Sequence, residues 1–135
     1  MKSGLLVLAN GALLVASSLG CHNPSANNDL VLLNTVTLDA PPTIASTATL
    51  TIGLDVQVRE CLKFDHIESH RTASYASLTV WGKNIRAGIT DRAILCPTLL
   101  LERHEYQAEP PFQNTFTVQV DRGRLSPLIA TVQVR

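Results

Sequence analysis

A short run in the first half of the chain carries the residues best suited to bind a metal ion, His66-Ile67-Glu68-Ser69-His70. In a strand, side chains two residues apart project from the same face, so His66, Glu68 and His70 share one face and Ile67 points to the other. Residues four apart are separated by about 13 Å along a straight strand, too far to share one ion. Only a neighbouring pair could do so, helped by His104 or Glu102 from another strand. We therefore interpret this run as a solvated outer face, with a metal site at His66, Glu68, His70 and His104 as the alternative.

Other kinds of active-site chemistry find little support in the sequence. It contains no Gly-x-Ser-x-Gly elbow for a nucleophile and no glycine-rich phosphate-binding loop. Glu102 and Glu105 lie among charged neighbours, so nothing predicts the burial that acid catalysis requires. Eleven basic residues balance eleven acidic ones, which leaves no basic stripe of the kind that binds nucleic acid. These observations favour a non-enzymatic protein without a cofactor and exclude a nucleic-acid binder.

The elements that must position these residues are organised around residues 48–61. Apolar side chains fall there on every second residue, at Leu50, Ile52, Leu54, Val56 and Val58. Polar or small residues alternate with them, which predicts a strand with one buried face. We expect this segment to be the central strand of the domain, running directly into Cys61.

Similar patterns, bounded by turns, predict further strands at residues 30–38, 64–71, 75–81, 98–106, 115–120 and 129–134. Turns are expected at Pro41-Pro42, at Glu109-Pro110-Pro111 and at Asp121-Arg122-Gly123. We interpret residues 82–91 as a loop, and residues 86–95 could hold a short helix because they lack strand alternation. Aromatic residues make up only 4% of the chain, so the core must be mostly aliphatic. The length allows one domain, and we predict an all-β fold, a single β-sandwich of about seven strands.

Three cysteines are present, Cys21, Cys61 and Cys96. We pair Cys61 with Cys96, because Cys21 lies at the end of an apolar leader that explains it separately. In an oxidising compartment such a disulfide stabilises by about 3–4 kcal/mol on the chain-entropy estimate. That is a large share of the roughly 5–15 kcal/mol by which a domain is stable. The alternative is that both thiols are free and coordinate a metal with nearby histidines.

The first twenty residues have the features of a secretory signal peptide, with Lys2 followed by the apolar run GLLVLANGALLVA. This run is too short to span a bilayer comfortably. Its ending, Ser17-Ser18-Leu19-Gly20-Cys21, resembles the lipobox of bacterial lipoproteins, although that motif prefers Leu at the position of Ser18 and a small residue at that of Leu19. The resemblance implies cleavage before Cys21 and attachment of fatty acyl chains such as palmitate to this residue. The alternatives are an ordinary cleaved signal peptide and an uncleaved signal anchor.

Residues 21–29 then form a polar tether that includes a proline. In Gram-negative lipoproteins an Asp after the acylated cysteine favours the inner membrane, so His22 in that position implies the outer membrane. The eight residues after Cys21 reach at most roughly 28 Å. We therefore expect an exported protein, anchored in the cell envelope through lipid, whose domain of residues 30–135 lies close to the headgroups.

Roughly the last hundred residues resemble the immunoglobulin-like modules of uncharacterised bacterial secreted lipoproteins. The residues that carry the likeness are Cys61-x-x-Phe64-Asp65, Ile67-Glu68, Arg71, Leu78-Thr79-Val80, Gly82, Cys96 and Phe116-Thr117-Val118-x-Val120. The antibody-type pattern is not met, because Trp81 follows Cys61 too far along the chain and the two cysteines are too close together. The resemblance thus implies an immunoglobulin-like architecture and no particular binding site.

The residues most able to anchor a partner are aromatic: Trp81, Tyr75, Tyr106 and Phe112. We interpret Trp81 as filling the core beside the disulfide, and Phe112, between Pro111 and Gln113, as the exposed candidate. The predicted function is that of an envelope lipoprotein that binds a protein or glycan partner, or assists an envelope assembly. The alternatives are a periplasmic metal-binding domain and an inhibitor of a secreted hydrolase, with residues 108–114 as the inserted loop.

Overall fold

The computed structural model describes residues 30–59, 61–85, 96 and 99–135. This part of the chain contains nine strands and no helix: β1 (Leu30–Leu32), β2 (Asn34–Asp39), β3 (Thr43–Ile44), β4 (Leu50–Val58), β5 (Leu62–Arg71), β6 (Tyr75–Asn84), β7 (Leu100–Ala108), β8 (Thr115–Val120) and β9 (Leu128–Val134). The all-β prediction is confirmed. Accordingly, the described residues include no helix that could cross a membrane. The predicted signal peptide, Cys21 and the predicted tether lie outside the described residues, as does the possible short helix at residues 86–95.

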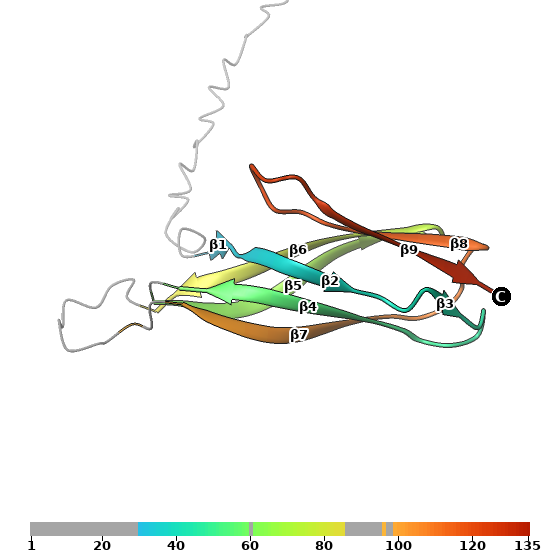
Figure 1. Ribbon diagram of the computed structural model, residues 1–135, viewed down its shortest axis with the longest axis horizontal. Coiled ribbons are helices and arrows are strands. Elements are labelled where there is room, and N and C mark those ends of the chain that lie inside the picture. The colour runs from blue at the N-terminus through green and yellow to red at the C-terminus, as the bar shows by residue number, and fades with distance from the viewer. Residues whose placement is uncertain (1–29, 60, 86–95, 97–98) are drawn as a thin grey trace, which may run out of the picture.

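The strands form two sheets that lie one above the other (Figure 1). In the larger sheet β5 pairs with one edge of β6, while β1 and β8 pair with different ends of its other edge; β9 and β3 continue the sheet beyond β8. The smaller sheet has the order β2-β4-β7. The β6–β8 and β3–β9 pairs are parallel, and the other pairs are antiparallel. The predicted central strand is thus confirmed, since β4 lies between two partners.

One hydrophobic core lies between the two sheets and draws on both of them. The five alternating residues of β4 are at most 2% exposed. They pack with the inward residues of the larger sheet, including Leu78, Val80, Phe116, Val118, Val120 and Val132. Phe116 is the one aromatic residue among the fully buried side chains of the described chain, as the low aromatic content predicted.

The predicted first strand, residues 30–38, is divided between the two sheets. β1 pairs with β6, whereas β2 pairs with β4, and Leu33 lies between them with its side chain 1% exposed. The Leu33 amide donates to the carbonyl of Val80 at 2.9 Å, which fixes the crossing point. A Cβ on Gly82 would lie 2.5 Å from Leu33 Cδ2, so only glycine leaves room for this side chain. Since β6 extends to Asn84, Gly82 is part of this strand, and the prediction that a loop begins at this residue is wrong.

The disulfide and a hairpin complete the fold. Cys61, between β4 and β5, is bonded to Cys96, between β6 and β7, and their Cα atoms are 4.8 Å apart. The predicted disulfide is confirmed, and it joins two connections that pass from one sheet to the other. The predicted turn between β8 and β9 is also confirmed, because Gly123 has a φ of 63° and its amide donates to Asp121 Oδ1 at 2.9 Å.

Candidate functional site

The outer face of β5 carries the side chains that the sequence singled out as candidate ligands. His66, Glu68 and His70 are 47%, 49% and 85% exposed, whereas Ile67 packs against the core. A β-bulge between Phe64 and His66 allows both Phe64 and Ile67 to face inward although they are three residues apart. The predicted outer face is confirmed.

The two histidines lie beside different carboxylates. Trp81 Nε1 donates to Glu68 Oε2 at 2.8 Å, and His70 Nε2 lies 3.8 Å from Glu68 Oε1. His66 Nδ1 lies 2.7 Å from Asp65 Oδ2, so its ring is engaged by a different carboxylate. We call the surface formed by His66, Glu68, His70 and Trp81 the histidine face. Within the described part of the chain, no group of three or more His, Cys, Asp or Glu side chains is arranged to hold a metal ion.

Trp81 lies on this outer face and not in the core. Its neighbours Val80 and Gly82 are buried, and strand alternation therefore turns the indole outward. The prediction that Trp81 fills the core beside the disulfide is wrong. The hydrogen bond to Glu68 holds the indole against β5, so the histidine face presents a fixed aromatic side chain beside exposed imidazoles.

His104 and Glu102, the other proposed ligands, lie in the smaller sheet. They are opposite Leu54 and Val56 in the register of β4 and β7, so both side chains point to the inner side. The His104 ring stacks on Phe64 with centroids 3.7 Å apart, and His104 Nε2 is 3.1 Å from Glu102 Oε2. The structure thus does not bring His104 together with the histidines of β5. Inward polar side chains on the edge strand β7 instead limit strand pairing with other chains.

A second charged cluster, not anticipated from the sequence, crosses the outer face of the smaller sheet. Arg103 on β7 donates to Asp39 Oδ2 on β2 at 2.6 Å and to Asp55 Oδ1 on β4 at 3.2 Å. The hydrogen bond to Asp39, followed by the one to Asp55, raises the pKa of Arg103. The guanidinium lies over Gly53, where a Cβ would overlap it. Gly53, a glycine in the middle of a strand, is the sequence signal that could have indicated this close approach.

The Arg103 cluster borders a shallow hollow of about 430 Å³, lined by Asp39, Pro41, Thr49, Thr51, Gly53, Arg103 and Glu105. Both carboxylates nearest the guanidinium are already hydrogen-bonded to it. The cluster therefore joins the three strands of the smaller sheet and offers no unpaired cation to a ligand.

Phe112, the predicted exposed anchor, is half-buried. Its ring meets Phe116 edge-on at 5.0 Å, and the Arg71 guanidinium carbon lies 5.0 Å from its centroid. Arg71 Nη2 also donates to the carbonyl of Pro111 at 3.1 Å. The segment before β8 is thus packed onto the core, with less of Phe112 available to a partner than the sequence suggested.

Comparisons of the chain with protein-family models, with curated proteins and with solved structures found no match.

Proposed function

We propose that this protein is an exported lipoprotein, anchored in the cell envelope through acylated Cys21, that binds a protein or glycan partner and catalyses no reaction of its own. The apolar leader ending in Gly20-Cys21 supports the anchor. The polar tether after it supports a folded domain held close to the membrane.

The observation that carries this proposal is the disulfide between Cys61 and Cys96. Disulfides persist in secreted and envelope proteins and are rare in the reducing cytosol. With these two sulfurs joined, Cys21 is the remaining cysteine of the chain. A single cysteine directly after a secretory leader is the residue that lipoprotein processing requires.

We extend the proposal to the architecture, which we infer to be an immunoglobulin-like β-sandwich. One core between two sheets supports this, as does the disulfide within the same unit. Two features depart from immunoglobulin domains, whose sheets are antiparallel and whose disulfide joins two strands across the core. Here β6 and β8 are parallel, and the disulfide joins two connections at one end of the sheets.

We place the partner-binding surface on the histidine face. Tryptophan is enriched among residues that dominate binding energies, and Trp81 is already oriented by Glu68. The exposed His66 and His70 beside it offer hydrogen-bond donors and acceptors that suit a protein backbone or a sugar hydroxyl.

Two experiments test the proposal. Metabolic labelling with a clickable fatty acid should label the native chain and not the Cys21→Ser variant; equal labelling, or none, would contradict the anchor. A photo-crosslinking residue at position 70 should give a discrete adduct in cells, whereas the same residue at Thr131, on the exposed outer face of β9, should not. An identical adduct pattern from both positions would count against the histidine face.

A further inference from the structure

The end of the sheets that holds the disulfide exposes an unusual amount of apolar surface. The described chain has nine large hydrophobic residues that are exposed, and six of them lie at this end: Leu30, Val31, Ile85, Leu99, Leu100 and Leu101. Leu101 is 64% exposed. Next to them, a hollow of about 250 Å³ opens where the chain passes from β1 to β2, and Arg59 and Leu62 line it together with Val31. Apolar surface concentrated in this way marks an interaction site.

The charged residues that the structure describes at the extreme of this end all have one sign. We count the charged residues of the described chain at or beyond the last two residue pairs of each strand that ends here. They are Arg59, Lys63 and Lys83, and all three are exposed. Lys63 lies directly opposite Lys83 in the β5–β6 pair. Like charges in this position destabilise a sheet, and no described acidic residue forms an ion pair with either lysine. An anionic ligand would remove this repulsion.

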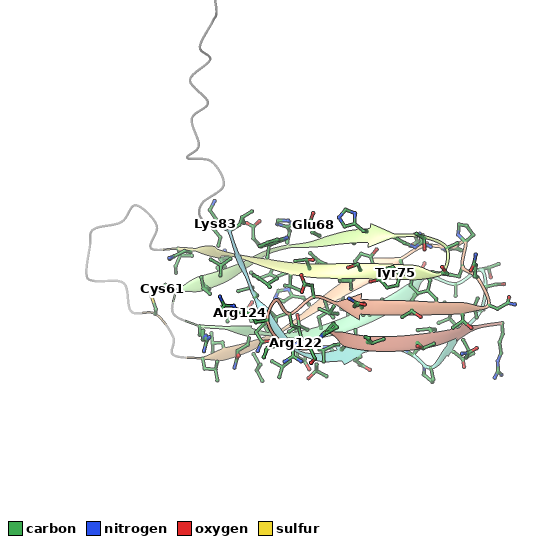
Figure 2. All side chains as sticks on the ribbon, turned by 90° about the horizontal axis from the view of Figure 1, so that it is seen from above. Cys61, Glu68, Tyr75, Lys83, Arg122 and Arg124 are labelled. Atoms are coloured by element: carbon green, nitrogen blue, oxygen red, sulfur yellow. A yellow bond between two sulfur atoms is a disulfide. The ribbon has the colours of Figure 1, made fainter. Side chains whose placement is uncertain are left out.

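The opposite end of the sheets differs, because by the same criterion both signs occur there: Glu109 with Arg71 and Arg135. Figure 2 shows Cys61, Lys83 and Arg124 toward one end of the sheets and Tyr75 toward the other. The molecule is thus polarised along its long axis, with a basic and apolar surface at the disulfide end.

The chain enters the domain at this same end, since β1 begins at Leu30, which pairs with Lys83. The eight residues between Cys21 and Leu30 span at most roughly 28 Å. If Cys21 is fixed in a bilayer, the tether therefore delivers the disulfide end to the headgroups. Tethering also keeps the effective concentration of the domain at the membrane surface high, so even weak contacts between the disulfide end and the membrane can form.

We propose that the disulfide end, formed by Leu30, Val31, Arg59, Lys63, Lys83, Ile85 and Leu99 to Leu101, docks on an anionic lipid surface; this inference rests on the proposed anchor at Cys21. The basic side chains contact headgroup phosphates, and the exposed leucines insert at the boundary between the headgroups and the acyl chains. Docking holds the long axis of the domain upright and turns the opposite end away from the membrane.

Trp81 provides a direct probe, because it is the single tryptophan and lies two residues, about 7 Å, from Lys83 along β6. The native acylated protein is reconstituted into vesicles that contain dansyl-phosphatidylethanolamine, with either phosphatidylcholine alone or phosphatidylcholine and phosphatidylglycerol. We expect stronger energy transfer from Trp81 on the anionic vesicles, and a decrease as salt is raised.

The matched variants are K63Q/K83Q and R135E, which change the net charge by the same amount at opposite ends of the molecule. Each basic residue near an anionic surface is worth about fivefold in binding, so K63Q/K83Q should weaken docking by about 25-fold. R135E should leave energy transfer unchanged. Urea midpoints at or above that of the native chain would establish that both variants remain folded.

Flotation of the vesicles separates the two proposals. Protein that fails to float counts against the anchor at Cys21. Protein that floats, but whose energy transfer depends neither on phosphatidylglycerol nor on Lys63 and Lys83, overturns the docking proposal. A surface built for a protein partner would give this second result, because pure lipid vesicles would leave it unoccupied.

Discussion

Replacing Gly82 by alanine should destabilise the protein through a single buried contact. The new Cβ would lie 2.5, 2.7 and 2.9 Å from three carbons of Leu33, whose side chain is 1% exposed and cannot move into solvent. Overpacking of this kind costs about 1–3 kcal/mol. Alanine is favoured over glycine within a strand by roughly 0.5–1 kcal/mol. We therefore expect Gly82→Ala to lower the free energy of unfolding by about 0.5–2 kcal/mol.

A double-mutant cycle measured by urea unfolding, with the disulfide intact, tests this reasoning. Leu33→Ala alone should cost about 2–5 kcal/mol. In that background the clash is absent, so Gly82→Ala should become stabilising by about 0.5–1 kcal/mol. The control is Gly53→Ala, because its Cβ meets the exposed, flexible end of Arg103; this change should stay within about 0.5 kcal/mol of wild type. Additive effects of the Gly82 and Leu33 substitutions would refute the proposed packing.

Three further predictions concern buried and surface contacts. Thr35 is fully buried and its hydroxyl has no protein hydrogen-bond partner, so Thr35→Val should raise the free energy of unfolding by about 1–2 kcal/mol; an unchanged or lower value would contradict this. The double variant C61S/C96S should lose about 3–4 kcal/mol, and reduction of the wild type should have the same effect; a protein equally stable in both states would be unexpected. Glu68→Ala should alter the fluorescence of Trp81 while changing stability by less than about 0.5 kcal/mol, and an unaltered spectrum would argue against the hydrogen bond.

Strand pattern and cysteine chemistry predicted the centre of the fold from the sequence alone. The alternation from Leu50 to Val58 was sufficient to identify β4, because a strand with one buried face must show it. The division of the first strand at Leu33 was not predicted, since passing from one sheet to the other does not change the alternation of apolar and polar residues in a recognisable way. Gly82 was wrongly predicted to begin a loop for a related reason. The sequence does not distinguish a glycine that makes room for a neighbouring side chain within a strand from one that ends a strand.

Prediction of the surface also depended on strand alternation. It failed where contacts between residues distant in sequence determine the arrangement of the side chains. The face shared by His66 and His70 follows from alternation, although the bulge before them could not be anticipated. Trp81 was predicted to fill the core beside the disulfide, yet its position next to buried Val80 turns it outward. The Arg103 cluster joins three strands that are distant in sequence, and only their register brings its members together.

The central claim is that one cysteine carries the membrane anchor while the other two stabilise the fold. Mass spectrometry of the protein purified from native membranes, without reduction, tests it most directly. We expect the amino-terminal peptide to begin at Cys21 and carry acyl chains, and the peptides of Cys61 and Cys96 to appear as one linked species. An unmodified Cys21 together with free thiols at both later positions would contradict the account.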